Sequence, residues 1–366
     1  MTLDADTRFM SLALTLGRRG LGNAWPNPAV GAVVVKDGVV VGRGWTQPGG
    51  RPHAEVEALR RAGGAARGAT LYATLEPCSH HGKTPPCVDA ITAAGIARVV
   101  SSLEDPNPEI AGQGHARLMS QGVAVTTGVC AEEARRAHAG HIRRVRDGRP
   151  HVTLKLAVSS DGKAGLAGRE PAAITGETAQ QRVHLMRSMN DAVVTGIGTV
   201  LADDPQLNVR LPGMRQRSPV RVVLDSRLRL PLQSRLAGSA ARTLDWVFME
   251  EGGKPAHEAE LTAAGVEVLR VPGTNGRLDL AAALRSLAAR GITRVMVEAG
   301  PILSAAFLSA DLVDQAALFR SPEPIGAGGI DALEGLPLAA LTRSPKFRLV
   351  GSEQVGVDTL EVYERN

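Results

Sequence analysis

Apolar and polar residues recur along the first 148 positions with spacings that alternate between helix and strand. Residues 4–18 place Phe9, Leu12, Ala13 and Leu16 on one side of a helix. Further along, short apolar runs bounded by turn residues are typical of buried strands. The strands expected in this half are 30–35, 39–41, 69–75, 98–103 and 123–127, and the further helices are 54–62, one that opens at Cys87, and 131–145.

The second half repeats this rhythm. Its expected strands are 151–158, 191–195, 220–224, 243–248, 266–271 and 294–297, and its expected helices are 177–189, 278–289 and 302–309. Strands that alternate with helices predict an α/β fold, in which helices cover both faces of a sheet. The segment Arg146-Asp147-Gly148-Arg149-Pro150 interrupts the pattern, so we expect domains at 1–148 and 149–366.

Composition places the chain among ordinary soluble proteins. Its 366 residues suit two domains, and 43% hydrophobic with 22% charged residues is typical of globular proteins. No apolar run is long enough to cross a membrane, and the acidic N-terminus lacks the basic start of a signal peptide. We therefore expect a cytoplasmic protein. The net charge of +5 suits a phosphorylated substrate or a solvated surface equally well.

Four residues with metal and proton chemistry stand out in the first half. His53 precedes the helix at 54–62, Glu55 follows two residues later, and Cys78 and Cys87 flank a loop after the third strand. One imidazole and two thiolates leave the fourth position of a tetrahedral zinc for water, which is the pattern of a catalytic site. The spare carboxylate suits proton transfer, as in zinc deaminases. Eight residues separate the cysteines where the usual deaminase signature has two, so the match is one of residue type.

Two other readings of these residues stay open. The cysteines could form a disulfide, although three cysteines and no secretory signal favour a reducing compartment. A structural zinc would need a fourth ligand, which His80 or His81 could supply. Cys130 lies outside the group, and we expect it to be a small buried residue.

Two glycine-containing turns follow strands of the second half. Residues 193–199 and 297–303 place Gly196, Gly198 and Gly300 where backbone N–H groups could approach a phosphate, and Pro301 suits the first turn of a helix. Neither turn has the Gly-x-Gly-x-x-Gly pattern of a dinucleotide-binding Rossmann fold. Each turn alone is a weak indication.

Several segments together resemble one family over nearly the whole chain, the bifunctional riboflavin-biosynthesis deaminase/reductases. The segments that carry the resemblance are 27–31 (Asn-Pro-Ala-Val-Gly), 52–55 (Pro-His-Ala-Glu), 74–87, 105–108 (Asp-Pro-Asn-Pro), 154–157, 161–163, 201–205 and 297–301. The long loop between Cys78 and Cys87 is the most specific, because it separates this family from cytidine and tRNA deaminases.

The resemblance implies a fold and two reactions. The first domain would have the three-layer α/β/α fold of cytidine deaminases, and the second the α/β fold of dihydrofolate reductase. The first would use Zn²⁺ to hydrolyse the 2-amino group of 2,5-diamino-6-ribosylamino-4(3H)-pyrimidinone 5′-phosphate. The second would use NADPH to reduce the ribosyl group of the product to a ribityl chain. We expect a homo-oligomer that acts on this small phosphorylated pyrimidine, with no nucleic acid or membrane as partner.

The resemblance also assigns roles to residues. Metal ligands would be His53, Cys78 and Cys87, with Glu55 as the catalytic acid and base. The deaminase substrate would contact Asn27, His80, Lys83, Asp105 and Asn107. The reductase substrate would contact Lys155, Arg187, Leu207, Arg210 and Glu298. NADPH would contact Ala157, Ala173, Thr199, Asp203, Ser226, Gly300, Pro301, Ile302, Leu303, Ser304, Ala305 and Ala306. Arg187 and Arg210 suit a phosphate because a guanidinium offers a planar fork of donors.

Two alternatives to this function remain, and departures from the family pattern motivate the first. Thr46 stands where the family usually has His, and residues 171–175 lack the expected Ser and Trp. An alternative is therefore a deaminase with a weak or inactive reductase domain. A protein that edits or binds nucleic acid through the basic residues of 135–149 is disfavoured, because stacking on bases requires aromatic residues and these make up 3% of the chain.

Overall fold

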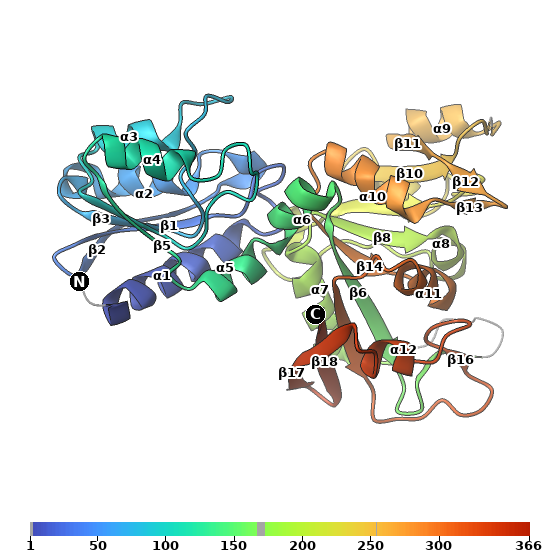
Figure 1. Cartoon of the computed structure of the whole chain (residues 1–366). Helices are drawn as coiled ribbons and strands as arrows, with labels where there is room; N and C mark the ends of the chain where they lie inside the picture. Colours follow the sequence, from blue (N-terminus) through green and yellow to red (C-terminus); the bar gives the residue numbers. More distant parts are fainter. Residues whose placement is uncertain (1–2, 167–172, 254) are drawn as a thin grey trace. The chain divides into compact units, whose positions relative to one another are not determined.

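A computed structural model describes residues 3–166, 173–253 and 255–366. Contacts between residues divide the chain into two compact units (Figure 1). The first comprises Met1–Arg149 with Ala288–Thr293, and the second Pro150–Leu287 with Arg294–Asn366.

The first unit is built on a sheet in the order β2-β1-β3-β4-β5. Its strands are β1 (Gly31–Lys36), β2 (Val39–Trp45), β3 (Thr70–Ala73), β4 (Arg98–Ser101) and β5 (Ala124–Thr127). β1 runs antiparallel to β2 and β3, whereas β3, β4 and β5 are parallel. The five strands expected from the sequence are confirmed.

Alternate residues of β1 face two different hydrophobic clusters, which makes this unit three-layered. Ala32 and Val34 belong to one cluster with residues of α2 (Ala54–Ala62), α3 (Cys87–Ala93) and α4 (Gln113–Ser120). Val33 and Val35 belong to the other, with residues of α1 (Leu3–Gly17) and α5 (Ala131–Ala137). Figure 1 shows these helices on the two faces of the sheet. Because side chains alternate across a strand, β1 is buried on both faces.

One helix prediction in this unit is wrong. The sequence predicts a single helix over 131–145, but the chain forms α5 and then α6 (Ala139–Asp147). The break is at His138, which is buried and makes a hydrogen bond of 3.0 Å between its Nε2 and Thr74 Oγ1. This tertiary contact overrides the continuous helical pattern. The sequence also missed α4, whose start at Gly112-Gln113-Gly114 has weak helix propensity.

Among the described residues, the second unit carries a nine-stranded sheet in the order β11-β10-β9-β8-β14-β6-β15-β18-β17. Its strands are β6 (His151–Val158), β8 (Ala192–Gly196), β9 (Val220–Leu224), β10 (Asp245–Glu250), β11 (Val266–Val271), β14 (Arg294–Glu298), β15 (Gln315–Arg320), β17 (Phe347–Val355) and β18 (Asp358–Arg365). The first seven strands in this order, from β11 at the edge to β15, are parallel to one another. β18 pairs antiparallel with β15, and β17 pairs antiparallel with β18 at the other edge. Short strands β7 (Lys163–Gly165) and β16 (Ile330–Asp331), and β12 (Gly273–Thr274) and β13 (Arg277–Leu278), form two further pairs.

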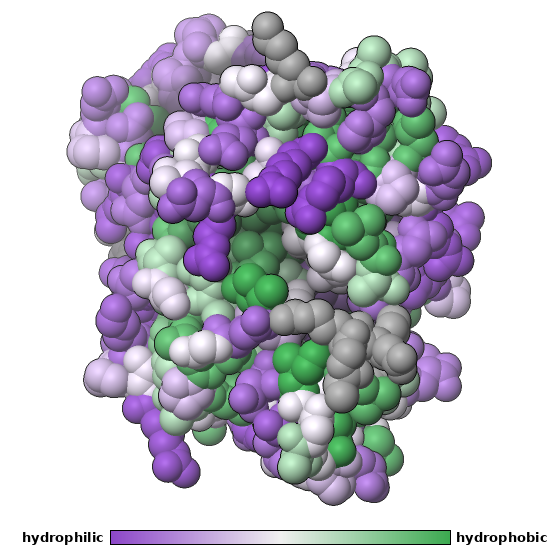
Figure 2. Space-filling model, turned by 90° about the vertical axis from the view of Figure 1, so that its right-hand side faces the viewer, coloured by the Kyte–Doolittle hydropathy of each residue, from purple (hydrophilic) through white to green (hydrophobic). Residues whose placement is uncertain are grey.

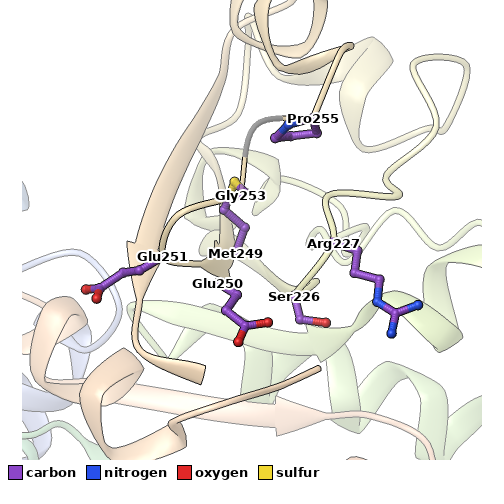
Figure 3. A pocket seen from close by; sticks show the side chains of 7 residues that line it. All are labelled: Ser226, Arg227, Met249, Glu250, Glu251, Gly253 and Pro255. Carbon is purple, nitrogen blue, oxygen red and sulfur yellow. The ribbon is translucent and has the colours of Figure 1, made fainter. Parts of the chain in front are cut away.

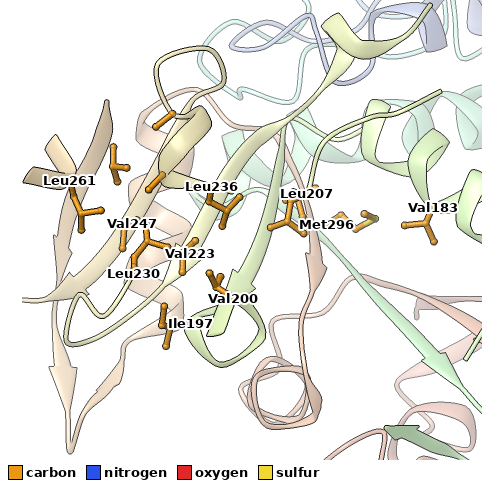
Figure 4. Close-up of a cluster of buried hydrophobic side chains, with 14 of the residues drawn as sticks. Val183, Ile197, Val200, Leu207, Val223, Leu230, Leu236, Val247, Leu261 and Met296 are labelled. Atoms are coloured by element: carbon orange, nitrogen blue, oxygen red, sulfur yellow. The ribbon is translucent and has the colours of Figure 1, made fainter. Parts of the chain in front are cut away.

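A large hydrophobic cluster forms the core of this unit (Figure 4). It gathers buried side chains such as Val223, Val247 and Met296 from the central strands. The helices of the unit are α7 (Glu177–Ser188), α8 (Ile197–Asp203), α9 (Glu258–Ala263), α10 (Leu280–Ala289), α11 (Pro301–Ser309) and α12 (Ala339–Thr342). The expected α/β class is therefore confirmed in both units.

Several elements of the second unit differ from the expectation. The helix predicted from 278 begins at Leu280, because Leu278 pairs with Gly273 across β12 and β13. The sequence missed α8, α9, β15 and the β17–β18 hairpin. Within the described part of the chain, no helix combines the length and apolar character that crossing a membrane requires.

Candidate active sites

His53, Cys78 and Cys87 converge at one end of the first sheet. His53 is the residue just before α2, Cys87 is the first residue of α3, and Cys78 follows β3. Nδ1 of His53 lies 3.3 Å from Cys87 Sγ and 3.6 Å from Cys78 Sγ, and the three candidate ligand atoms lie within 4.8 Å of one another. An imidazole nitrogen and two sulfurs at this spacing are a donor set that suits zinc.

The local environment prepares one of the thiols for a metal. A hydrogen bond from the Cys87 thiol lowers the pKa of Cys78 to about 4. The backbone N–H of Cys87 also donates to Cys78 Sγ over 3.2 Å. Because the thiolate is the form that binds a metal, Cys78 is predisposed to be a ligand.

Glu55 lies in the first turn of α2, beside the metal group. Its side chain is buried, and this burial raises the pKa of the Glu55 carboxyl to about 7. Among the described residues, Glu55 is not one of the three that form the metal group. A carboxyl group that titrates near neutral pH can both accept and donate a proton, which is what a general acid and base must do.

The two other readings of the cysteines lose support. All three cysteines are free thiols, so the disulfide is wrong. Among the described residues the metal cluster has three members, and His80 and His81 are exposed outside it, so no fourth ligand for a structural zinc is present. Cys130 is half-buried, not buried as expected, with its Sγ 3.8 Å from the carbonyl of Thr7.

Asn27 and Arg51 both approach the far nitrogen of the His53 ring. Asn27 Nδ2 lies 3.2 Å from His53 Nε2 and donates to the Gly50 carbonyl over 2.9 Å. Arg51 Nη1 lies 3.3 Å from the same nitrogen and donates to Thr84 Oγ1 over 2.5 Å. The sequence predicted Asn27 but missed Arg51, which connects the loop between the cysteines to the metal histidine.

Glu76 organises the loop that carries Asp105 and Asn107, a role that sequence analysis missed. Its carboxylate accepts four backbone N–H groups, from Asp105, Gly112, Gly114 and His115, over 2.7–3.3 Å. Asp105 Oδ1 in turn accepts the N–H of Asn107 over 2.8 Å. Only glycine suits position 114, because a Cβ there would lie 2.1 Å from the Pro77 carbonyl.

The remaining deaminase residues are less closely gathered. His80 and Lys83 are exposed on the loop between the cysteines. His80 is near enough to Asp105 to oppose the rise that burial causes in the pKa of that carboxyl. Thr46, which stands where the family usually has His, is buried and structural: its hydroxyl donates to the Pro28 carbonyl and accepts the N–H of Val30.

In the second unit, Lys155, Arg187 and Glu298 form a charged group where β14 ends beside the middle of β6. Lys155 on β6 and Glu298 on β14 are register partners. Arg187 on α7 binds both carboxylate oxygens of Glu298, over 2.9 and 2.6 Å. Burial would raise the pKa of Glu298, but Arg187 and Lys155 outweigh it and hold this pKa at about 2. Burial lowers the pKa of Lys155.

Arg210 and Leu207 follow in the loop after α8 and differ in exposure. Arg210 is exposed and donates through Nη1 to Asn208 Oδ1 over 3.1 Å. Arg187 binds the carbonyl of the same Asn208 over 3.0 Å. Leu207 is buried in the hydrophobic core, so the structure does not bring its side chain into the charged group.

The two glycine turns lie next to each other at the carboxyl ends of β8 and β14. These strands are parallel neighbours, and α8 and α11 begin directly after them. The N–H of Gly300 donates to Thr199 Oγ1 over 3.2 Å, which connects two residues expected to hold the cofactor. Helix N-termini at the carboxyl edge of a sheet favour a phosphorylated ligand.

The other expected cofactor residues are spread more widely. Ile302 is exposed, Pro301, Leu303 and Ala306 are half-buried, and Ser304 and Ala305 are buried within α11. Ala157 is half-buried on β6, while Asp203 and Ala173 are exposed. Pro171, one of the departures noted above, lies outside the described residues.

Ser226 lines a cavity of about 320 Å³ after β9 (Figure 3). The other lining residues are Arg227, Met249, Glu250, Glu251, Gly253 and Pro255. In Figure 3 the Glu251 carboxylate points away from Arg227. Figure 2 shows one face of the molecule, with a hollow in which hydrophobic residues are visible and hydrophilic residues at its border.

Comparisons with protein families cover both halves. A model described as the cytidine and deoxycytidylate deaminase zinc-binding region matches residues 3–103, and one described as the RibD C-terminal domain matches 150–360. The riboflavin biosynthesis protein RibD of Escherichia coli is 41% identical over 96% of this chain and 97% of its own length. That of Aquifex aeolicus is 38% identical over the full length of both.

Solved structures agree over the same span. RibD of Acinetobacter baumannii is 36% identical and superposes with a TM-score of 0.88 over the whole of both chains. A Thermotoga maritima protein, described as a diaminohydroxyphosphoribosylaminopyrimidine deaminase and 5-amino-6-(5-phosphoribosylamino)uracil reductase, is 37% identical with a TM-score of 0.85. The match includes 99% of the Thermotoga maritima chain and 100% of this one.

Proposed function

This chain belongs to the RibD family of bifunctional riboflavin-biosynthesis enzymes, and from that premise we propose the substrates and residues of its two reactions. Membership gives the chain a deaminase and a reductase activity. The observation that supports a deaminase site in the first unit is the convergence of His53, Cys78 and Cys87 beside the buried Glu55. The division of labour we propose is deamination by residues 1–148 and reduction by residues 149–366.

The first reaction is the hydrolytic loss of the 2-amino group of 2,5-diamino-6-ribosylamino-4(3H)-pyrimidinone 5′-phosphate. Zinc held by His53, Cys78 and Cys87 would activate water for attack on the pyrimidine. Glu55 accepts a proton from water and delivers one to the departing amine, because its pKa lies near neutral. Asn27 orients the His53 ring through Nε2.

The loops around this site bind the rest of the substrate. The Glu76 carboxylate holds Asp105 through its backbone N–H, and Asp105 Oδ1 in turn accepts the N–H of Asn107. His80 and Lys83 stand on the exposed loop between the cysteines, where positive charge suits the substrate phosphate.

The second reaction is the reduction of the ribosyl group by NADPH, which supplies the hydride. The Thr199 hydroxyl, whose oxygen accepts the Gly300 N–H, and the N–H groups of the first turn of α11 would bind the cofactor phosphates. Lys155 and Glu298 are register partners on neighbouring strands and would contact the sugar, and Arg210 would bind its phosphate. Ser226 and Arg227 would hold the cofactor's 2′-phosphate.

A coupled assay on the purified chain tests both steps. The diaminopyrimidinone ribosyl phosphate is supplied, ammonia release is measured, and NADPH is then added and its oxidation followed. Ammonia release that disappears in Glu55→Gln, with NADPH oxidation in the wild type, supports the assignment. Zinc-loaded wild type that releases no ammonia would refute the proposed substrate.

Ammonia release without NADPH oxidation would instead favour the alternative of an inactive reductase. Nothing in the fold or in the relatives favours that alternative. We further propose that the enzyme is a cytoplasmic homo-oligomer, which light scattering and cell fractionation would test.

A further inference from the structure

The charged group of Lys155, Arg187 and Glu298 contains one guanidinium, which Glu298 already neutralises, and two further guanidinium groups, those of Arg210 and Arg235, lie near it. Arg187 is paired with Glu298 through two hydrogen bonds. Arg210 hydrogen-bonds the neutral side chain of Asn208. In the described part of the chain, Arg235 makes no ion pair or hydrogen bond through its side chain, which is exposed. The site therefore carries positive charge that its own carboxylates do not balance.

The backbone of Arg235 is fixed next to the loop that carries Arg210. Its N–H donates to Asp204 Oδ1 over 2.8 Å, and Asp204 is the residue directly after α8. The following residue, Leu236, is fully buried in the hydrophobic core. The hydrogen bond to Asp204 and the buried side chain of Leu236 together fix the backbone position from which the exposed Arg235 side chain extends.

A buried arginine, Arg221, hydrogen-bonds both the loop that follows α8 and the segment that contains Arg235. Arg221 on β9 is 1% exposed and donates to the carbonyls of Gln206 and Leu236, over 3.4 Å in each case. Its charge is balanced by Asp245, whose Oδ2 lies 2.7 Å from Arg221 Nη2. Arg221 therefore holds the chain before Leu207 and the chain after Arg235 at a fixed separation.

Arg210 and Arg235 are close enough to repel each other. Burial lowers the pKa of Arg210, and the positive charges of Arg187 and Arg235 lower it further. Two guanidinium groups that repel each other and lack carboxylate partners are stabilised by a bound anion. A phosphate monoester, with up to two charges and three acceptor oxygens, suits two such groups.

We propose that Arg235 is a second phosphate-binding residue of the reductase site, where it acts with Arg210 on the 5′-phosphate of the substrate. This inference rests on the proposed reductase function. It adds a residue from the segment between β9 and β10 to the site, and it makes the phosphate the part of the substrate that this segment recognises.

The test compares Arg235→Gln with Arg242→Gln in the full-length enzyme. Arg242 is an exposed arginine of the same segment and serves as the control for the loss of one positive charge. A charge-assisted hydrogen bond contributes about 1.5–3 kcal/mol, so KM for the phosphorylated substrate should rise about 10- to 100-fold in Arg235→Gln. We expect kcat to change little, KM for the dephosphorylated substrate to stay unchanged, and Arg235→Lys to recover part of the affinity.

Binding of inorganic phosphate, measured by calorimetry, provides a readout that does not depend on turnover. The proposal is supported if Arg235→Gln binds phosphate more weakly than the wild type and Arg242→Gln binds it equally well. Both variants should bind NADPH with wild-type affinity. Wild-type phosphate affinity and wild-type KM in Arg235→Gln would overturn it. If phosphate binding depends on Arg235 but the wild-type enzyme oxidises no NADPH, the reductase assignment is refuted and the phosphate-binding role of Arg235 is not.

Discussion

Glu76→Gln perturbs a single carboxylate on which the loop of Asp105 and Asn107 depends. In the wild type both oxygens accept backbone N–H groups, two on Oε1 and two on Oε2. Glutamine keeps one oxygen and replaces the other with an NH₂ group, which is a donor. Two buried N–H groups would then face a donor instead of an acceptor.

The magnitude follows from those two unpaired groups. A buried N–H left without its acceptor costs about 1–3 kcal/mol, so two of them cost about 4 kcal/mol together. A free-energy change of about 4 kcal/mol shifts the opening equilibrium of the loop about 1,000-fold. Ammonia release should fall strongly because Asp105 is displaced, while reduction of supplied deaminated product continues.

Hydrogen exchange measures this opening directly. Amides of peptides that span residues 103–116 should exchange up to about 1,000-fold faster in Glu76→Gln. Glu109→Gln, which changes an exposed carboxylate in the same loop, is the matched control and should exchange like the wild type. Unchanged protection at Gly112 and Gly114 in Glu76→Gln would refute the reasoning.

Three further predictions concern the two units. Arg221→Met leaves the Asp245 carboxylate buried and unpaired, so the free energy of unfolding should fall by about 3–5 kcal/mol, and adding Asp245→Asn should recover part of that loss in denaturant titrations. The pKa of Glu298 is held at about 2, below its unfolded value of 4.5, so its contribution to stability is present above pH 4.5 and is lost as the pH falls towards 2. The stability difference between wild type and Glu298→Gln should therefore shrink by about 2 kcal/mol between pH 6 and pH 3, and an unchanged difference would contradict this. Removal of zinc by a chelator should abolish ammonia release and leave NADPH oxidation of supplied deaminated product intact; parallel loss of both activities would count against a metal site confined to the first unit.

The residues with distinctive chemistry could be predicted from the sequence, because few residue types bind zinc. His53, Cys78 and Cys87 were expected as a group, and the structure places them within 4.8 Å of one another. Glu76 and Arg51 could not be found in this way. The acceptors and donors that give them a role come from segments distant along the chain, and no local pattern encodes such contacts.

The same distinction separates the predicted elements from the missed ones. The central strands are rich in Val and Leu, so β6, β8 and β9 were expected. β17 lies at the edge of its sheet with all seven residues between Phe347 and Val355 exposed, so its sequence has no hydrophobic alternation. The helix expected at 131–145 was divided by a buried contact of His138 that only the folded structure creates.

The central claim is that one chain carries two successive reactions at two separate sites. The most direct test is to mix two full-length variants, Glu55→Gln and Arg187→Ala, each of which disables one site. Glu55→Gln alone should release no ammonia, and Arg187→Ala alone should stop at the deaminated product. The mixture should convert the diaminopyrimidinone phosphate to the ribityl product with oxidation of NADPH. A single variant that loses both reactions, or a mixture that completes neither, would contradict the account.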